Sequence, residues 1–247
     1  MCIRDRHKSF DGIPILNNIS TKFDQGKTNL IIGQSGSGKT VLLKCLLGLH
    51  QPDTGEVLYD GISNNKMNEN QKTLLRREMG MVFQGSALFD SMSVLENVMF
   101  PMKMLTNKNE DEIIERSQNV IKRVELNKAE NKLPSELSGG MRKRVGLARA
   151  IIYKPEIIVY DEPTTGLDPV VSDSIDQLVI KMRDQLNCTT IVVTHDTRSM
   201  RRVGNHVMML HHGLIHANGK PDEIFKSTDP IVHKFVNGIA DPKDLEF

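Results

Sequence analysis

The sequence predicts an α/β protein built around a parallel sheet. Three short apolar runs rich in β-branched residues, at positions 28–32, 156–160 and 189–194, have the composition of strands that are buried on both faces. Between the last two runs, apolar residues recur at helical spacing from position 171 to 186, which predicts a crossover helix between parallel strands. Strands that alternate with helices are typical of the α/β class.

The middle of the chain predicts a helical insert in this α/β body. Residues 93–132 contain no convincing strand pattern, and Asn109 followed by three acidic residues is typical of a helix N-terminus. Residues 206–219 predict a hairpin whose strands are broken at Gly213 and at the Asn218–Gly219 pair. No repeat, low-complexity tract or linker divides the chain, so we expect a single domain over residues 1–247.

Composition excludes several classes of protein. The chain has 247 residues, enough for a substantial core, and its 32 Lys+Arg against 31 Asp+Glu give no electrostatic footprint for nucleic acid. No apolar run approaches the ~18 residues that a membrane-spanning helix needs. Three scattered cysteines (Cys2, Cys45 and Cys188) and a start without a secretory signal favour a reducing, cytoplasmic compartment.

The strongest chemical signal is the segment Gly-Gln-Ser-Gly-Ser-Gly-Lys-Thr at positions 33–40, which matches G-x-x-x-x-G-K-[ST]. It stands between a predicted strand and a predicted helix at 41–49. In such a loop the backbone N–H groups surround phosphate oxygens, Lys39 reaches the outer phosphates and Thr40 ligates Mg²⁺. The alternative is a glycine-rich turn without a ligand.

Two further segments carry weaker signals. Asp161 and Glu162 follow a predicted buried strand, where one acid could hold the water shell of Mg²⁺ and the next could polarise an attacking water. Ser138 and two glycines open a basic helix, which could form a second anion site. Taken alone, the acids could be turn residues, and the second segment could be an ordinary helix cap with solvated charges, including Lys143.

Together these segments resemble the nucleotide-binding subunit of ATP-binding cassette (ABC) transporters, from about residue 7 to 241. Residues 33–40 resemble the Walker A loop, 137–141 the family signature, and 157–162 the Walker B strand with its catalytic glutamate. The other matches are Gln84 to the Q-loop glutamine, residues 166–168 to the D-loop, His195 to the switch histidine, and Phe10 to the aromatic that stacks on adenine. Without the resemblance, His195 and Gln84 would be polar residues at strand ends, and Phe10 would belong to the core or its rim.

The resemblance implies a P-loop NTPase of the ABC ATPase fold. This fold has a RecA-like parallel-sheet core, an antiparallel β subdomain and an inserted helical subdomain, here at about 90–150, and a C-terminal tail is expected at 229–247. ATP and Mg²⁺ are the implied cofactors. The implied site residues are Phe10, Gly33, Ser35, Gly36, Ser37, Gly38, Lys39 and Thr40 for ATP; Glu162, His195 and Gln84 for catalysis; Thr40, Gln84 and Asp161 for the metal; Ser138, Gly139 and Gly140 as a signature acting in trans; and Asp168 in the D-loop.

Because each motif occurs once, the resemblance implies a homodimer in which the signature of one subunit faces the ATP of the other. Met141, residues 84–90 and residues 229–241 resemble the ATPase of Mla/Mce-type phospholipid transporters in particular. That subgroup implies integral-membrane permease subunits, an Mce-domain substrate-binding protein, a small regulatory subunit and a peripheral location on the cytoplasmic side of the inner membrane. The alternatives are the ATPase of another ABC transporter, for lipoprotein release or amino-acid import, and a soluble ABC ATPase of iron-sulfur assembly.

Two local features add expectations. Four methionines, Met92, Met99, Met102 and Met104, follow the Q-loop, where they either fill the core or face the permease. Residues 1–6 include Arg4, Asp5 and Arg6, a pattern that argues against the edge strand with which family members begin and suggests an extraneous start.

Overall fold

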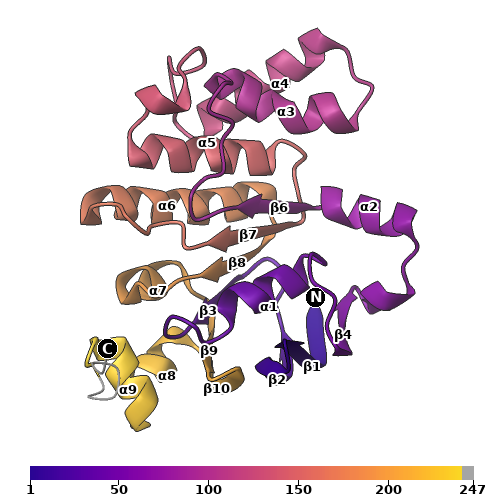
Figure 1. The fold of residues 1–247 in the computed structure, drawn as a ribbon. Coiled ribbons are helices and arrows are strands. Elements are labelled where there is room, and N and C mark those ends of the chain that lie inside the picture. Colours follow the sequence, from indigo (N-terminus) through magenta and orange to yellow (C-terminus); the bar gives the residue numbers. More distant parts are fainter. Residues whose placement is uncertain (241–247) are drawn as a thin grey trace. The chain divides into compact units, whose positions relative to one another are not determined.

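A computed structural model describes residues 1–240, and it divides the chain into two units (Figure 1). Of the described residues, unit 1 comprises 1–73 together with 191–240, and unit 2 comprises 74–190. Strand β8 (Thr189–Val193) lies across the boundary and therefore contributes residues to both.

Unit 1 contains a four-stranded antiparallel sheet in the order β2-β1-β4-β5. Its strands are β1 (Cys2–Phe10), β2 (Ile13–Lys22), β4 (Thr54–Tyr59) and β5 (Ile62–Ser63), and η1 (Asn64–Lys66) follows them.

The prediction that residues 1–6 are unsuited to a strand is wrong. Ile3 and Arg6 are buried in β1, whereas Arg4 and Asp5 are exposed. Two consecutive exposed residues fit between two buried ones because the register of β1 shifts between Ile3 and Arg6. Asp5 takes a positive φ of 47° at this shift. The charged residues that argued against a strand thus lie on an irregularity within it.

The second sheet segment of unit 1 carries the predicted strand at 28–32, which is confirmed as β3 (Thr28–Ile32) with all five residues buried. The order is β10-β9-β3-β8; β9 (His206–His211) is parallel to β3 and antiparallel to β10 (Leu214–Gly219). The predicted hairpin is therefore confirmed, with its turn at Gly213 and not at Gly219. The helices of this unit are α1 (Lys39–Leu46), α7 (Thr197–Val203), α8 (Pro221–Phe225) and α9 (Pro230–Asn237).

Unit 2 contains the remaining part of the α/β pattern, in the order β8-β7-β6. Strands β6 (Met79–Val82) and β7 (Ile157–Asp161) are parallel, and α6 (Pro169–Leu186) connects β7 to β8 as the predicted crossover helix. Helix α2 (Glu69–Arg77) crosses the unit boundary before β6. The predicted α/β class with parallel strands is confirmed.

The helical part of unit 2 consists of α3 (Val94–Leu105), α4 (Glu110–Arg123), η2 (Pro134–Glu136) and α5 (Gly139–Ile151). Helices α3, α4 and α5 lie together in Figure 1. Residues 93–132 contain no strand, as predicted. Asn109 caps α4 because its Oδ1 accepts a hydrogen bond from the backbone N–H of Glu112 at 2.7 Å.

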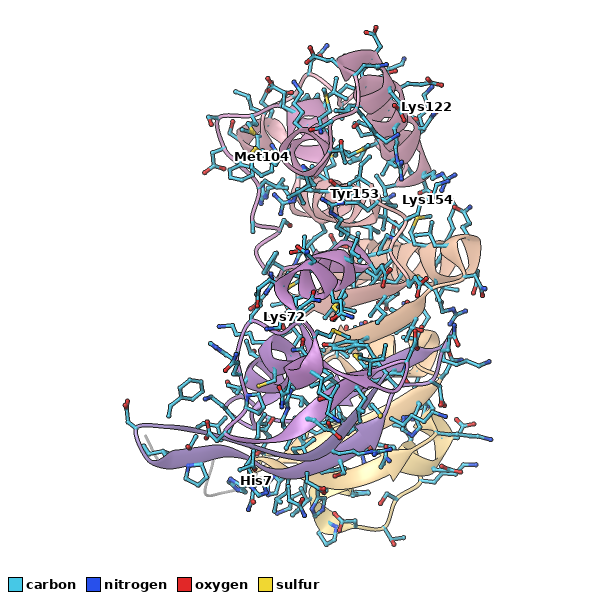
Figure 2. All side chains as sticks on the ribbon, turned by 90° about the vertical axis from the view of Figure 1, so that its right-hand side faces the viewer. His7, Lys72, Met104, Lys122, Tyr153 and Lys154 are labelled. Carbon is cyan, nitrogen blue, oxygen red and sulfur yellow. The ribbon has the colours of Figure 1, made fainter. Side chains whose placement is uncertain are left out.

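The four methionines after the Q-loop do not share one environment. Met99 and Met102 are buried in the core of unit 2, whereas Met104 is 65% exposed (Figure 2) and Met92 is half-buried. The core-filling alternative therefore applies to Met99 and Met102, and only Met92 and Met104 remain candidates for a contact surface.

The single-domain prediction and the helical subdomain at about 90–150 stay predictions. Helix α9 occupies part of the expected C-terminal tail, and residues 241–247 of that tail lie outside the described residues. None of the helices formed by residues 1–240 combines the length and apolarity required to cross a bilayer.

Candidate functional site

The loop at 33–40 connects β3 to α1 in unit 1, in the strand-loop-helix order that the motif predicts. Two of its glycines are required by the local geometry. Gly33 has a φ of +146°, and a Cβ there would lie 2.2 Å from the carbonyl oxygen of Leu210. Gly38 caps α1 with a φ of +103°, and a Cβ there would lie 2.9 Å from the side chain of Leu16.

The polar side chains of this loop are arranged around its backbone. Lys39 is buried, and its Nζ donates hydrogen bonds to the carbonyl oxygens of Gly33 at 2.8 Å and Gln34 at 2.7 Å. Ser37 Oγ is buried and has no hydrogen-bond partner within residues 1–240. A buried hydroxyl without a partner is costly, so a ligand oxygen at this position would satisfy it. The loop therefore fits a phosphate group.

Of the other predicted residues of unit 1, His195 and Phe10 lie at strand ends and Thr40 lies in helix α1. Thr194, which precedes His195, donates its backbone N–H to the Ile31 carbonyl at 3.2 Å, so His195 follows the strand beside β3. Its side chain is exposed. Thr40, in the first turn of α1, is also exposed, and its hydroxyl is an oxygen ligand of the type that Mg²⁺ prefers.

Phe10 ends β1 and is 40% exposed as a residue. The ring lies edge-on to His50 at a centroid distance of 5.6 Å, and Lys8 Nζ lies 5.1 Å from its centroid. This end of β1 is held by Asp53, which accepts hydrogen bonds from Lys8 Nζ at 2.8 Å and from the N–H and hydroxyl of Ser9 at 2.6 Å each. The hydrogen bonds from Lys8 and Ser9 lower the pKa of Asp53 to about 2. Sequence reasoning missed Lys8, Ser9 and Asp53.

In unit 2 the structure brings Gln84 and Glu162 together. Glu162 Oε2 accepts hydrogen bonds from Gln84 Nε2 at 3.3 Å and from Thr165 Oγ1 at 2.8 Å. Glu162 has a φ of +48°, a left-handed conformation that is unusual for a residue with a side chain. Asp161, the last residue of β7, directly precedes it.

Lys143 links the backbones of the same two residues. Its Nζ donates to the carbonyl oxygen of Gln84 and, at 3.3 Å, to that of Glu162. Lys143 is 6% exposed, and burial lowers its pKa, an effect that the charges of Glu162 and Asp161 oppose. The sequence had placed this lysine among solvated helix charges. No sequence pattern separated Lys143 from the other basic residues of this helix as a buried contact residue.

The signature segment begins helix α5. Ser138 is the N-cap, and its Oγ accepts a hydrogen bond from the Met141 N–H at 3.3 Å. A Cβ on Gly140 would lie 2.6 Å from Val171 Cγ1, so this glycine allows close packing against α6. Gly139 is similarly close to a neighbour, since a Cβ there would lie 3.0 Å from the side chain of Leu167.

Asp168, the predicted D-loop residue, is the N-cap of α6. Its Oδ1 accepts hydrogen bonds from the N–H groups of Val170 and Val171, at 3.0 Å each. The remaining predicted residues of the phosphate loop, Ser35 and Gly36, are exposed, and a Cβ on Gly36 would meet open space.

Comparison with known proteins identifies the family. The family model for ABC transporters matches residues 16–165, more than half of the chain. The chain is 37% identical to the "Probable ribonucleotide transport ATP-binding protein mkl" of Mycobacterium leprae, covering 94% of this chain and 67% of that protein. It covers 64% of the corresponding protein of Mycobacterium tuberculosis (strain H37Rv), so it spans about two thirds of the length of these relatives.

In two further comparisons, the match covers a larger share of the other protein's length. The "Intermembrane phospholipid transport system ATP-binding protein MlaF" of Escherichia coli K12 is 37% identical over 92% of this chain and 84% of its own. Among solved structures, the dimeric ATP-binding cassette MJ0796 bound to ADP and Pi is 32% identical, with a TM-score of 0.81 over 89% of this chain and 98% of its own. These matches confirm the predicted P-loop ABC ATPase fold, and this chain belongs to the ABC transporter family as an ATP-binding ABC ATPase.

Proposed function

We propose that this chain is the ATP-hydrolysing subunit that powers a membrane ABC transporter, and that this transporter moves phospholipids between membranes. The observation that carries the proposal is the loop at 33–40, where Ser37 Oγ is buried without a partner among the described residues and Lys39 donates hydrogen bonds to two loop carbonyls. Both groups would donate hydrogen bonds to phosphate oxygens. The phospholipid cargo is supported by the similarity to MlaF over 92% of the chain.

Each predicted site residue receives one role in this proposal. The ring of Phe10 stacks on adenine, and its exposed face supports that role. The phosphates are held by Gly33, Ser35, Gly36, Ser37, Gly38, Lys39 and Thr40, and Ser138, Gly139, Gly140 and Asp168 act at the interface with a second copy of the chain.

The hydrolytic roles follow from the contacts of Glu162. Its carboxylate accepts a proton from the attacking water, and the hydrogen bonds from Gln84 and Thr165 fix the carboxylate in place. His195 donates a hydrogen bond to the terminal phosphate. Hydrolysis of an ATP bound between two copies would remove the ligand that joins them, which allows the dimer to open.

The proposed cofactor of this reaction is Mg²⁺, which neutralises phosphate charge when bound. Its protein ligands would be the hydroxyl of Thr40, the carboxylate of Asp161 and the side-chain amide oxygen of Gln84. In the orientation described here Gln84 uses its NH₂ group on Glu162, which leaves its oxygen for the metal. Such a small set of oxygen ligands suits Mg²⁺, which completes its shell with water and phosphate.

The proposed partners are a second copy of the chain, integral-membrane permease subunits, an Mce-domain substrate-binding protein and a small regulatory subunit. The dimeric cassette MJ0796 supports the first, and MlaF supports a transporter that acts between membranes. We place the chain on the cytoplasmic face of the inner membrane as a peripheral subunit.

The ATPase proposal is tested by Glu162→Gln and Lys39→Ala, with Glu156→Gln as a matched control. Glu156 precedes β7 and is exposed, whereas Glu162 follows the same strand, so the control changes a carboxylate at the other strand end. We expect Glu162→Gln to accumulate an ATP-bound dimer with little turnover, Lys39→Ala to weaken ATP binding, and Glu156→Gln to behave as the unaltered chain. Wild-type turnover in Glu162→Gln would refute the assignment.

The cargo is tested by purifying the Glu162→Gln chain with bound ATP from detergent-solubilised native membranes and identifying its partners by mass spectrometry. Recovery of a permease together with an Mce-domain protein would support phospholipid transport. Recovery of a permease without an Mce-domain protein would contradict the phospholipid cargo and leave the ATPase role of the chain unchanged. Recovery of soluble partners alone would contradict the transporter and favour iron-sulfur assembly.

A further inference from the structure

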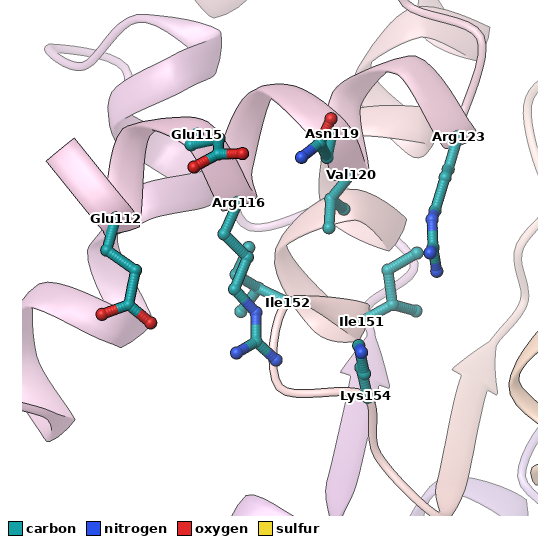
Figure 3. A pocket seen from close by; sticks show the side chains of 9 residues that line it. All are labelled: Glu112, Glu115, Arg116, Asn119, Val120, Arg123, Ile151, Ile152 and Lys154. Atoms are coloured by element: carbon teal, nitrogen blue, oxygen red, sulfur yellow. The ribbon is translucent and has the colours of Figure 1, made fainter. Parts of the chain in front are cut away.

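A hollow lies in unit 2 between α4 and the end of α5, outside all the motifs described above (Figure 3). Its volume is about 260 Å³. It is lined by Glu112, Glu115, Arg116, Asn119, Val120, Arg123, Ile151, Ile152 and Lys154. Six of these belong to one face of α4 at helical spacing, because positions 112, 115, 116, 119, 120 and 123 are related by steps of three or four residues.

The hollow combines an apolar floor with a cationic edge. Val120, Ile151 and Ile152 form the apolar part, and each is at most 7% exposed as a residue. The guanidinium groups of Arg116 and Arg123 descend from α4 on either side of Ile151, and Lys154 rises towards them from the loop below (Figure 3). A ligand that fills this space would touch both hydrocarbon and positive charge.

The three cations of the hollow are not paired with any side chain of the described residues. Within residues 1–240, none of the side chains of Arg116, Arg123 and Lys154 forms an ion pair or a hydrogen bond. Other arginines of the same unit do find partners, such as Arg144, which contacts Glu125 at 3.0 Å. Gathering like charges around one hollow is unfavourable unless an anion offsets the repulsion.

The acids at the edge limit which anion fits. Glu112 is already paired with Lys108, so it contributes little net charge to the hollow. Glu115 has no such partner within the described residues and would repel a polyanion such as a triphosphate. The three cations and this one carboxylate leave a net charge of about +2 at the hollow, which a compact anion of about two negative charges would neutralise.

We propose that this hollow binds a phosphate monoester that carries a short apolar group. The planar forks of Arg116 and Arg123 suit bidentate contacts with phosphate oxygens, and Lys154 adds a third charge. A carboxylate offers one charge and two oxygens, whereas a phosphate monoester offers about two charges and three terminal oxygens. The apolar group would pack against Val120 and Ile151, the apolar lining residues that retain some exposure.

The site is independent of the proposed ATPase function, because its lining residues include none of the predicted site residues. Phosphate monoesters occur both as soluble compounds and as the headgroup of phosphatidic acid. Both sources present the same group to Arg116 and Arg123, so the experiment below distinguishes them.

The test is isothermal titration calorimetry of the full chain with phenyl phosphate, after the nucleotide sites have been saturated with a non-hydrolysable ATP analogue and Mg²⁺. We expect one phenyl phosphate per chain, and binding that is tighter at about pH 8 than at about pH 5, because the second phosphate pKa is about 6. Benzoate, with the same ring and a single charge, should bind more weakly.

Variants locate the binding. Arg116→Ala/Arg123→Ala should weaken it by about tenfold or more, since each arginine contributes a charge-assisted hydrogen bond. Lys122→Ala is the matched control: Lys122 neighbours Arg123 in α4 but does not line the hollow, and Figure 2 shows its position relative to Lys154. If the double variant melts at a lower temperature than the control, Lys154→Ala, which changes a loop residue, replaces it.

The outcomes are distinct. Phenyl phosphate binding that is unchanged in both Arg116→Ala/Arg123→Ala and Lys154→Ala, or that benzoate equals, would overturn the proposal. Sedimentation with phosphatidic-acid vesicles that depends on Arg116 and Arg123 would assign the site to a lipid headgroup. Binding of phenyl phosphate without such sedimentation would assign it to a soluble ester.

Discussion

Replacing Lys143 with methionine should impair both stability and hydrolysis. Methionine retains the length and much of the hydrocarbon of lysine but removes the ammonium that donates to the carbonyl oxygens of Gln84 and Glu162. Those two residues follow separate strands, β6 and β7, and also share the side-chain contact at 3.3 Å. Lys143→Met therefore removes a contact that joins the backbones of Gln84 and Glu162, while the side chains of both residues keep their chemistry.

The magnitude follows from two opposing effects. Each hydrogen bond from a charged donor contributes about 1.5–3 kcal/mol, so the loss of two would cost about 3–6 kcal/mol if nothing else changed. Burying the ammonium of Lys143 is itself unfavourable, as its lowered pKa indicates. Methionine removes this desolvation penalty, which offsets part of the cost of the lost hydrogen bonds. We expect a net loss of about 2 kcal/mol in the free energy of unfolding.

The effect on hydrolysis should exceed the effect on stability. A shift of about 1 Å in a catalytic group costs up to about a hundredfold in rate, and Glu162 would lose one of its backbone constraints. Urea unfolding and steady-state ATP hydrolysis of Lys143→Met would measure both quantities, with Lys122→Met as a control on an exposed lysine of the same unit. A Lys143→Met chain with unaltered turnover and stability would refute the assignment of Lys143 as a positioning residue.

Three further predictions test other parts of the structure. Asp53→Asn should lower the melting temperature at neutral pH, and the difference from the unaltered chain should shrink as the pH falls from about 4 towards about 2. The pKa of Asp53 is lower in the folded chain than in the unfolded chain, so its carboxylate stabilises the fold above the unfolded-state pKa and loses this contribution as the pH falls through the folded-state pKa. Gly140→Ala should destabilise by about 1–3 kcal/mol in urea unfolding, and Val171→Ala in the same chain should restore part of that loss. Met102→Ala should cost about 2–5 kcal/mol, whereas Met104→Ala should change the unfolding free energy little.

The fold was predictable wherever burial on two faces made the strand pattern continuous. Residues 28–32 and 189–193 form strands as predicted, because neither run contains a charged residue that would obscure the signal. Strand β1 was missed for the opposite reason. Its charged residues Arg4 and Asp5 fall on a register shift, and the buried Arg6 breaks the rule that inward positions are apolar.

The site was predictable where a motif places several residues within a few positions, as in the loop at 33–40. Contacts between distant parts of the sequence gave no such signal. The partners of Lys143 lie 59 and 19 residues away, and Asp53 holds Ser9 across 44 residues, so neither spacing nor periodicity could indicate them. Such residues are ordinary in type and acquire their roles only through the fold.

The signature and the D-loop are separate segments in the sequence, but in the structure the two helices that follow them are in contact. Helix α5 begins at Ser138 and packs through Gly140 against Val171, and Val171 in turn donates its N–H to the cap residue Asp168. A bulkier residue at Gly140 would push the two helix N-termini apart, since its Cβ would come within 2.6 Å of Val171. Close packing alone thus explains this glycine without a ligand. It also ties the positions of Ser138 and Asp168 together, so a change in either helix N-terminus should be transmitted to the other.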